Sequence, residues 1–322
     1  MKHQLSILCL GVLGACSVVM AGVYPNDDDN LWPNQVVPYQ FGGSVSAYNR
    51  SIVLQAMAKW EAEANVDFVV RNGEADYLSI VDAQGGAGSS YPPPAGYRPG
   101  TGAHTLNIRI NLPSLGNQTQ QVYGIAHEVG HVLGLDHTMQ RIDRDNYITV
   151  NTDNMAGGQG NFAINPNSLA WPRDQIDIDS IMNYGLCFFT SCGNCPADPD
   201  NCATVTLLPP LDTEWAGNLF CPAIENPGDV CIGHRNHLST WDKLLMSFLY
   251  PEPNYKFIEQ DYDGFVQDGS FYRPYDDFGT GELAVPPNSV LWIMPGEYTQ
   301  TADVYSKPLV LRAPLGDVVI RE

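Results

Sequence analysis

The sequence predicts an α+β protein in which helices pack against a mixed β-sheet, followed by a smaller β-rich segment. The first observation is the order of elements up to His137, strand–helix–strand–strand–strand–helix, which favours a sheet covered by helices. The second is composition: 44% of the 322 residues are hydrophobic and 16% are charged, which permits a large core and argues against global disorder. The third is a change after Pro253, where short β runs alternate with turn sequences.

The individual elements follow from the spacing of apolar residues. Residues Val36–Phe41 alternate as a strand does, and Ala47–Ala64 carries an apolar stripe at helical spacing. Two further strands are expected at Val66–Arg71 and Tyr77–Val81. After a loop rich in glycine and proline, Thr105–Leu112 alternates again and is predicted as the last strand of the sheet. This strand is also a candidate edge for pairing with an extended peptide.

The helix that follows contains the most informative motif of the chain. It reads His127-Glu128-x-x-His131-x-x-Gly134-x-x-His137. Residues four apart share one helix face, so the first two histidines present two imidazoles to one ion. Gly134 permits the positive φ that ends the helix, and His137 then returns as a third ligand. Three protein ligands leave a tetrahedral zinc one open position for water, and Glu128 is placed to take a proton from that water. The motif predicts one catalytic zinc ion and a hydrolase.

The N-terminal sequence predicts export. Residues 1–21 combine Lys2, a short apolar run and small residues before Gly22, which is typical of a secretory signal peptide. The run ending at Cys16 also resembles a bacterial lipobox, so a lipid anchor at Cys16 is an alternative. No second apolar run long enough for a transmembrane anchor follows. The net charge of −20 disfavours nucleic acids and anionic membrane surfaces as partners. A secreted, extracellular protein is expected.

Six of the eight cysteines fall in one stretch, residues 186–231, which is interpreted as a cysteine-rich insertion. In an exported protein, an even cluster of this kind predicts up to three local disulfides. The alternative is a second zinc site at Cys192-x-x-Cys195, although no matching pair of cysteines accompanies it. The sequence leaves the pairing of the cysteines open.

Two later runs add to the zinc motif. They are Arg141-Ile142-Asp143-Arg144-Asp145 and Ser180-Ile181-Met182-Asn183-Tyr184-Gly185. With these three motifs in this order, and with Trp32 near the start, the chain resembles the astacin family of metzincin metalloproteases over about residues 31–251. The zinc motif alone also looks like the matrixins, another metzincin group. A matrixin-type secreted metalloprotease therefore remains an alternative.

The resemblance implies a two-lobed catalytic domain that hydrolyses peptide bonds in proteins. It assigns one zinc ion to His127, His131 and His137, and the role of general base to Glu128. Tyr184 would lie near the metal, as a ligand in the resting state or as a donor to the developing oxyanion; a buried tyrosine bonded to backbone is the alternative. A catalytically weak metal-containing binding protein is a further alternative from a different functional class.

The expected organisation has four parts. Residues 1–21 are the signal peptide, 22–30 a short N-terminal segment, 31–253 the metzincin catalytic domain and 254–322 a β-rich segment. The last segment resembles the opening coils of a right-handed parallel β-helix, because its β runs are short and separated by turns. The chain departs from the astacin pattern in that residues 22–186 contain no cysteine.

Overall fold

The computed structural model divides the chain into a larger and a smaller compact unit. The larger unit comprises residues 18–247, and the smaller comprises residues 1–17 and 248–322. Cys16 and most of the predicted signal peptide lie outside the described residues. The structure describes residues 5–7, 23–25, 28–83, 89–92, 94–110, 116–170, 176–299 and 307–321.

The first lobe of the larger unit is built on a four-stranded sheet in the order β4-β3-β5-β6. The strands are β3 (Val36–Phe41), β4 (Asp67–Val70), β5 (Tyr77–Asp82) and β6 (Ala103–Ile108), and all three pairings are parallel. Alternate side chains of the sheet point into the core and are fully buried, because successive strand residues face opposite sides. These buried residues are Val37, Leu78, Ile80, Leu106 and Ile108.

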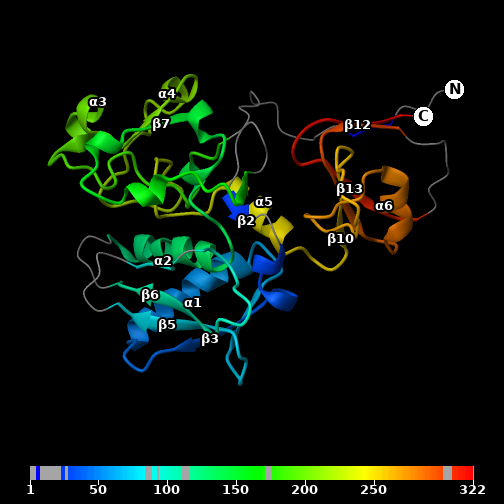
Figure 1. Ribbon diagram of the computed structural model, residues 1–322, viewed down its shortest axis with the longest axis horizontal. Helices are drawn as coiled ribbons and strands as arrows, with labels where there is room; N and C mark the ends of the chain where they lie inside the picture. The colour runs from blue at the N-terminus through cyan, green and yellow to red at the C-terminus, as the bar shows by residue number, and fades with distance from the viewer. Residues whose placement is uncertain are drawn as a thin grey trace. The chain divides into compact units, whose positions relative to one another are not determined.

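Two long helices, α1 (Ala47–Glu61) and α2 (Gln118–Val132), lie side by side in this lobe (Figure 1). Trp60 of α1 is fully buried, and its indole N–H donates to the carbonyl of Ala126 in α2 over 2.9 Å. Asn117 caps α2 by accepting from the backbone N–H of Gln120 over 3.0 Å. Such a cap satisfies a backbone donor that the first helical turn leaves without an intrahelical acceptor.

The sheet resembles the prediction closely, with differences of detail that include strand ends shifted by one residue at β4 and β5. The sequence predicts a mixed sheet, and among the described residues its antiparallel part is one bridge, in which Ser90 pairs with Asn107 of the edge strand β6. The strand predicted at Thr105–Leu112 is shifted: β6 begins at Ala103 and ends at Ile108, opposite Asp82, the last residue of β5. The apolar alternation continues to Leu112, but Asn111 and Leu112 lie outside the described residues.

The second lobe follows α2 and contains little regular structure. Its strands are β7 (Ile148–Val150) and β9 (Val205–Leu207), which pair antiparallel, and its helices α3 (Pro199–Cys202) and α4 (Leu211–Glu214) are short. In Figure 1 this lobe lies on the side of α2 away from the sheet. The rest of the larger unit consists mainly of loops and short 3-10 turns. Those turns are Asp28–Asn30, Pro33–Gln35, Thr138–Gln140, Arg144–Asn146, Thr152–Asn154, Gln159–Phe162 and Cys195–Ala197.

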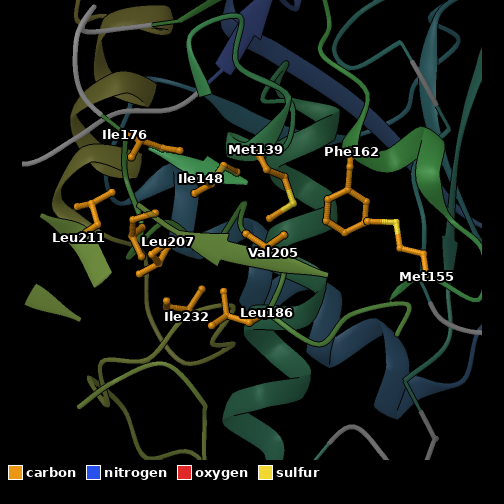
Figure 2. Close-up of a cluster of buried hydrophobic side chains, with 11 residues drawn as sticks. Met139, Ile148, Met155, Phe162, Ile176, Leu186, Val205, Leu207, Leu211 and Ile232 are labelled. Carbon is orange, nitrogen blue, oxygen red and sulfur yellow. The ribbon is translucent and has the colours of Figure 1, made fainter. Parts of the chain in front are cut away.

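An apolar cluster forms the core of the second lobe (Figure 2). It gathers residues from β7, β9 and α4, and from turns and loops well separated in sequence. Its members are Met139, Ile148, Met155, Phe162, Ile176, Ile178, Leu186, Val205, Leu207, Leu211 and Ile232. The segment 186–231 therefore supplies strand β9 and part of this core, which makes it integral to the lobe.

Three disulfides lie in the second lobe, as the cysteine pattern predicts. They join Cys187 to Cys195, Cys192 to Cys202, and Cys221 to Cys231. The alternative of a zinc site at Cys192-x-x-Cys195 is wrong, because both cysteines are oxidised and offer no thiolate to a metal.

Two further elements complete the larger unit. Strand β2 (Val23–Pro25) pairs antiparallel with β8 (Ser168–Ala170), so the short N-terminal segment joins a two-stranded sheet. Helix α5 (Thr240–Leu249) begins in the larger unit, where its Asp242 is buried, and its last two residues belong to the smaller unit.

The smaller unit is β-rich. Strands β10 (Tyr255–Ile258), β11 (Val290–Ile293) and β13 (Val310–Arg312) form one parallel sheet. Strand β14 (Val318–Arg321) pairs parallel with β12 (Gly296–Thr299) and antiparallel with β1 (Leu5–Ile7). Helix α6 (Phe278–Ala284) contributes Phe278 to the apolar core of this unit. No helix among the described residues has both the length and the apolar character needed to cross a bilayer.

Candidate active site and metal centre

The three histidines of the zinc motif meet at one point. His127 and His131 project from one face of α2, and His137 follows the turn after the helix. One ligand atom from each lies within 4.8 Å of the others, and all three side chains are buried. The turn depends on Gly134, whose φ of 110° is a conformation that residues with a Cβ rarely adopt.

Each imidazole is oriented by a hydrogen bond at Nδ1. His127 Nδ1 lies 2.7 Å from the carbonyl oxygen of Ile181, and His131 Nδ1 lies 2.6 Å from that of Leu135. His137 Nδ1 lies 3.2 Å from Oε1 of Gln140. Carbonyl and amide oxygens only accept, so each Nδ1 carries the proton and donates it. This tautomer leaves the Nε2 lone pairs available as ligands, as in other metal-binding histidines.

The arrangement of the Nε2 atoms fits a metal ion. His131 Nε2 and His137 Nε2 lie only 3.2 Å apart. With both protons on Nδ1, neither Nε2 can donate to the other, so two lone pairs face each other in a buried site. A cation bound between them removes this repulsion. Burial lowers the pKa of all three imidazoles, most strongly for His127 and His137, and the nearby charge of Arg235 lowers it further. The neutral form that results is the form that binds zinc.

A methionine turn packs directly under the metal-binding helix. Met182 is fully buried against Gly130, which lies between the two histidines of α2. A Cβ on Gly130 would come within 2.7 Å of the Met182 sulfur, so only glycine permits this close approach. The Met182 carbonyl accepts from the backbone N–H of Thr138 over 3.3 Å, which ties the turn to the segment that carries His137.

Glu128 lies beside the first histidine and is oriented from the sheet lobe. Its Oε2 accepts from the backbone N–H of Tyr91 over 2.9 Å. Burial raises the pKa of Glu128 to about 8, although the Tyr91 hydrogen bond and the charge of Arg235 act in the opposite direction. A carboxyl group in this range exchanges a proton near neutral pH, and a cation at the histidines adds positive charge that favours its ionised form.

Tyr184 lies against the third histidine. Its ring centroid is 4.3 Å from that of His137 and 6.3 Å from that of His127. The ring of Phe188 stacks on that of Tyr184, with centroids 5.0 Å apart and planes nearly parallel at 12°. Burial raises the pKa of Tyr184, and the neighbouring Glu128 carboxylate raises it further. The phenol therefore keeps its proton at neutral pH and is able to donate a hydrogen bond.

Sequence reasoning missed Arg235, which the fold brings to the site. Its guanidinium donates to the carbonyl of Asn183 over 3.2 Å and to that of His234 over 2.6 Å. The charge lowers the pKa of Glu128 and acts on Tyr184 as well. Arg235 is far from the zinc motif in the sequence, in the stretch just before the predicted closing helix. No spacing rule connects the two positions.

A buried carboxylate fixes the methionine turn. Asp242 of α5 accepts from the Ser180 hydroxyl over 2.6 Å, and from the backbone N–H groups of Ile181 and Ser239 over 2.9 Å each. Ile181 in turn provides the carbonyl that orients His127. The hydrogen bonds therefore run from helix α5 to His127 of the three-histidine cluster.

A helix with two histidines, a glycine turn that returns the third and a methionine turn beneath them are the combination found in metzincin zinc proteases. Residues 25–197 match the family model of the astacin peptidases. This match covers more than half of the chain. The protein therefore belongs to the astacin family of metzincin zinc metalloproteases, and the matrixin alternative is set aside.

Individual relatives agree with the family assignment. The chain is 32% identical over 252 residues to Tolloid-like protein 1 of Homo sapiens, covering 78% of this chain and 22% of that protein. It is 31% identical over 164 residues to astacin-like metalloprotease toxin 5 of Loxosceles gaucho, covering 51% of this chain and 81% of the toxin. The chain thus spans about a fifth of the length of the Tolloid-like relative.

One solved structure shows the same fold. It is high choriolytic enzyme 1, a hatching enzyme zinc-protease from Oryzias latipes, with a TM-score of 0.51 and 24% sequence identity. The match covers 76% of this chain and 98% of the hatching enzyme. The similarity shows that the two chains share a fold over that part.

Proposed function

We propose that the protein is a secreted zinc-dependent endopeptidase that hydrolyses peptide bonds in proteins or peptides. The observation that carries this proposal is the convergence of three neutral imidazoles, whose ligand atoms lie within 4.8 Å of one another, at the helix that also carries Glu128. His127, His131 and His137 would hold the ion. When bound, zinc supplies Lewis acidity and lowers the pKa of a coordinated water towards about 7.

Glu128 is the proposed general base. Its carboxylate accepts a proton from the attacking water as the new carbon–oxygen bond forms at the scissile carbonyl. The same carboxyl then returns the proton to the departing amine nitrogen as the carbon–nitrogen bond breaks. The hydrogen bond from the Tyr91 N–H holds one carboxylate oxygen in place. The other oxygen remains available for the proton.

Tyr184 is proposed to stabilise the oxyanion. Its raised pKa keeps the hydroxyl protonated, so the hydroxyl donates to the oxygen on which negative charge develops. The half-buried Arg235 guanidinium supports the same charge from the second lobe, since its field reaches both Glu128 and Tyr184. The Tyr184 hydroxyl and the Arg235 guanidinium both keep their protons throughout the reaction in this scheme.

The test is the variant Glu128→Ala with metal content measured in parallel. We expect cleavage of casein or gelatin to fall by at least about 10³-fold, because the proton has no acceptor, while about one zinc per chain stays at the three histidines. Gln118→Ala, an exposed change at the start of the same helix, is the matched control and should leave cleavage unchanged. Full activity of Glu128→Ala would show the mechanism to be wrong. Zinc-loaded wild-type protein that cleaves nothing in a broad peptide library would favour a binding protein.

Three disulfides are typical of oxidising compartments and support the proposal of secretion. The net charge of −20 supports protein or peptide partners over nucleic acids. A lipid anchor at Cys16 stays the alternative to signal cleavage after Ala21.

For residues 254–322 we propose the opening coils of a parallel β-helix, because β10, β11 and β13 pair in parallel.

A further inference from the structure

A second cluster of potential metal ligands lies in the larger unit, outside the three-histidine site. It consists of Asp179, His234 and His237, with one ligand atom from each within 4.8 Å of the others. Asp179 directly precedes the methionine turn, and the two histidines flank Arg235. The described residues contain one other cluster of this kind, Cys221, Glu225 and Cys231, but its cysteines form a disulfide.

The orientation of His237 is fixed by Asn236. The Asn236 amide nitrogen donates to Glu225 Oε2 over 2.8 Å and to the Asp229 carbonyl over 2.9 Å, so its Oδ1 is the acceptor. His237 Nδ1 lies 2.6 Å from that Oδ1 and must donate to it. In the neutral ring, Nε2 then carries a lone pair. This lone pair faces Asp179 Oδ2 at 3.0 Å, where two acceptors meet.

Asp179 offers a second atom to the same space. Its Oδ1 is buried and has no hydrogen-bond partner among the described residues, which is a costly state for a carboxylate oxygen. The His237 lone pair and the buried Asp179 Oδ1 are both acceptors without a donor. A cation or a proton placed between the side chains would satisfy both.

The distances suit zinc. Ligands at 2.0–2.1 Å from a tetrahedral ion lie roughly 3.3 Å from each other. Here His237 Nε2 is 3.0 Å from Asp179 Oδ2, and His234 Nε2 is 3.5 Å from Asp179 Oδ1. These values bracket the 3.2 Å between His131 Nε2 and His137 Nε2 in the three-histidine site.

We propose that Asp179, His234 and His237 bind a second zinc ion, with solvent at the fourth position. Asp179 and His237 each expose about a fifth of their side chain, at 23% and 22%, which gives the ion a route from solvent. In the metal-free state His234 Nε2 donates to the Asp179 carbonyl over 2.7 Å. Zinc replaces that proton, which is released to solvent, and the ring turns from the carbonyl towards the carboxylate.

The proposed ion has a structural consequence for the active site. It joins the residue before the methionine turn to the segment that carries Arg235, whose guanidinium donates to the Asn183 carbonyl in that turn. Binding would therefore hold the turn and Arg235 in one arrangement. The site is independent of the peptidase proposal, since its ligands are not those of the catalytic ion.

The zinc content of the purified protein tests the proposal. After equilibration with micromolar zinc at neutral pH and gel filtration, we expect two zinc ions per wild-type chain and one in His237→Gln. The matched control is His104→Gln, a buried histidine outside both clusters, which should keep two. His131→Ala should also lose one ion, so failure of the catalytic site is recognised separately. One ion in the wild type, or two in His237→Gln, would overturn the proposal.

A second measurement covers the case in which His237→Gln fails to fold. Metal-free wild-type protein is titrated with Co²⁺, and the visible absorption of the bound ion is followed. We expect the signal to rise until two equivalents are bound, in two phases with different spectra, because the ligand sets differ in having three histidines or two histidines and a carboxylate. Saturation at one equivalent contradicts the second site. It would mean that a proton, and not a metal ion, lies between His237 Nε2 and the Asp179 carboxylate.

Discussion

The two lobes of the larger unit contribute to one site by different structural means. The sheet lobe supplies His127, Glu128 and His131 from one regular helix, α2, which packs on α1. The second lobe supplies Tyr184 and Arg235 from irregular segments. In the first lobe, position follows from helical periodicity and a packed core. In the second lobe, position depends on individual buried hydrogen bonds and on disulfides.

This difference predicts different sensitivities. A regular element shares its stability among many backbone hydrogen bonds, so the loss of one side chain is spread over the element. An irregular turn that depends on the hydrogen bonds of one carboxylate has no other backbone hydrogen bonds to share the loss. We therefore expect the largest single effects of mutation in the second lobe, away from the metal ligands themselves.

The strongest test is Asp242→Ala. The change removes the acceptor of the Ser180 hydroxyl and of two buried backbone N–H groups, those of Ile181 and Ser239. Each buried donor left without a partner costs about 1–3 kcal/mol, so we expect a loss of about 3–5 kcal/mol in the free energy of unfolding. Denaturant unfolding measures it. Activity should fall too, because Ile181 orients His127.

The control for Asp242 is Asp212→Ala in α4, where the carboxylate is exposed and accepts hydrogen bonds from the neighbouring Thr213. That change should alter stability by no more than about 0.5 kcal/mol. Equal effects of the two substitutions would show that the turn does not depend on Asp242.

Reduction of the disulfides should separate the lobes. Each bridge closes a short loop, with a sequence separation of 8 or 10, and contributes about 3 kcal/mol in the chain-entropy model. Residues 22–186 contain no cysteine. We expect a reductant to accelerate amide hydrogen exchange in residues 187–231 while α1 keeps its protection. Equal acceleration in α1 would mean that the two lobes unfold as one cooperative unit.

The same contrast explains what the sequence could predict. Strand Val36–Phe41 has the predicted limits, and helix α1 begins at the predicted Ala47, because apolar spacing is a local signal. The three-histidine cluster was predictable for the same reason: an i, i+4 pair and a glycine lie within one short stretch. The end of β6 was not, because it depends on where β5 ends.

The contacts that complete the site have no local signal. Tyr91 holds Glu128 through a backbone N–H, and Ile181 orients His127 through a backbone carbonyl, so side-chain identity at these positions carries no information about the contact. Arg235 reaches the site through the fold of the second lobe. The number of disulfides was predictable from composition, but their pairing required the path of the chain between the cysteines.

The sheet lobe has its own sensitivity, to pH. Burial lowers the pKa of His104 to about 4, and the charge of Arg98 acts in the same direction. The unfolded chain binds a proton near pH 6.5 and the folded chain does not, so the stability from neutral His104 is present above about pH 6.5 and is lost as pH falls towards 4. Between about pH 7 and pH 5 we expect a loss of at most about 2 kcal/mol.

The matched variant for this pH effect is His104→Gln, whose amide does not titrate. The comparison is the slope of unfolding free energy against pH, measured in excess zinc for both proteins. The variant should lack the part of the slope that comes from His104, while any part due to metal release at the other histidines persists. Identical slopes would contradict the assignment to His104.

The smallest expected effect lies at the aromatic contact of Tyr184. Phe188 is 46% exposed and stacks on the Tyr184 ring, so it adds little to the core but restricts the tyrosine. An aromatic pair contributes about 0.5–1.5 kcal/mol beyond burial.

If Tyr184 stabilises the oxyanion, Phe188→Ala should lower kcat by roughly fivefold, the equivalent of about 1 kcal/mol, and leave KM unchanged. Phe265→Ala, the same substitution at a fully exposed position in the smaller unit, is the control and should change neither constant. A rise in KM alone would instead make Phe188 part of the substrate-binding surface. In that case Phe188→Tyr, which keeps the ring, should have the KM of the wild type rather than that of Phe188→Ala.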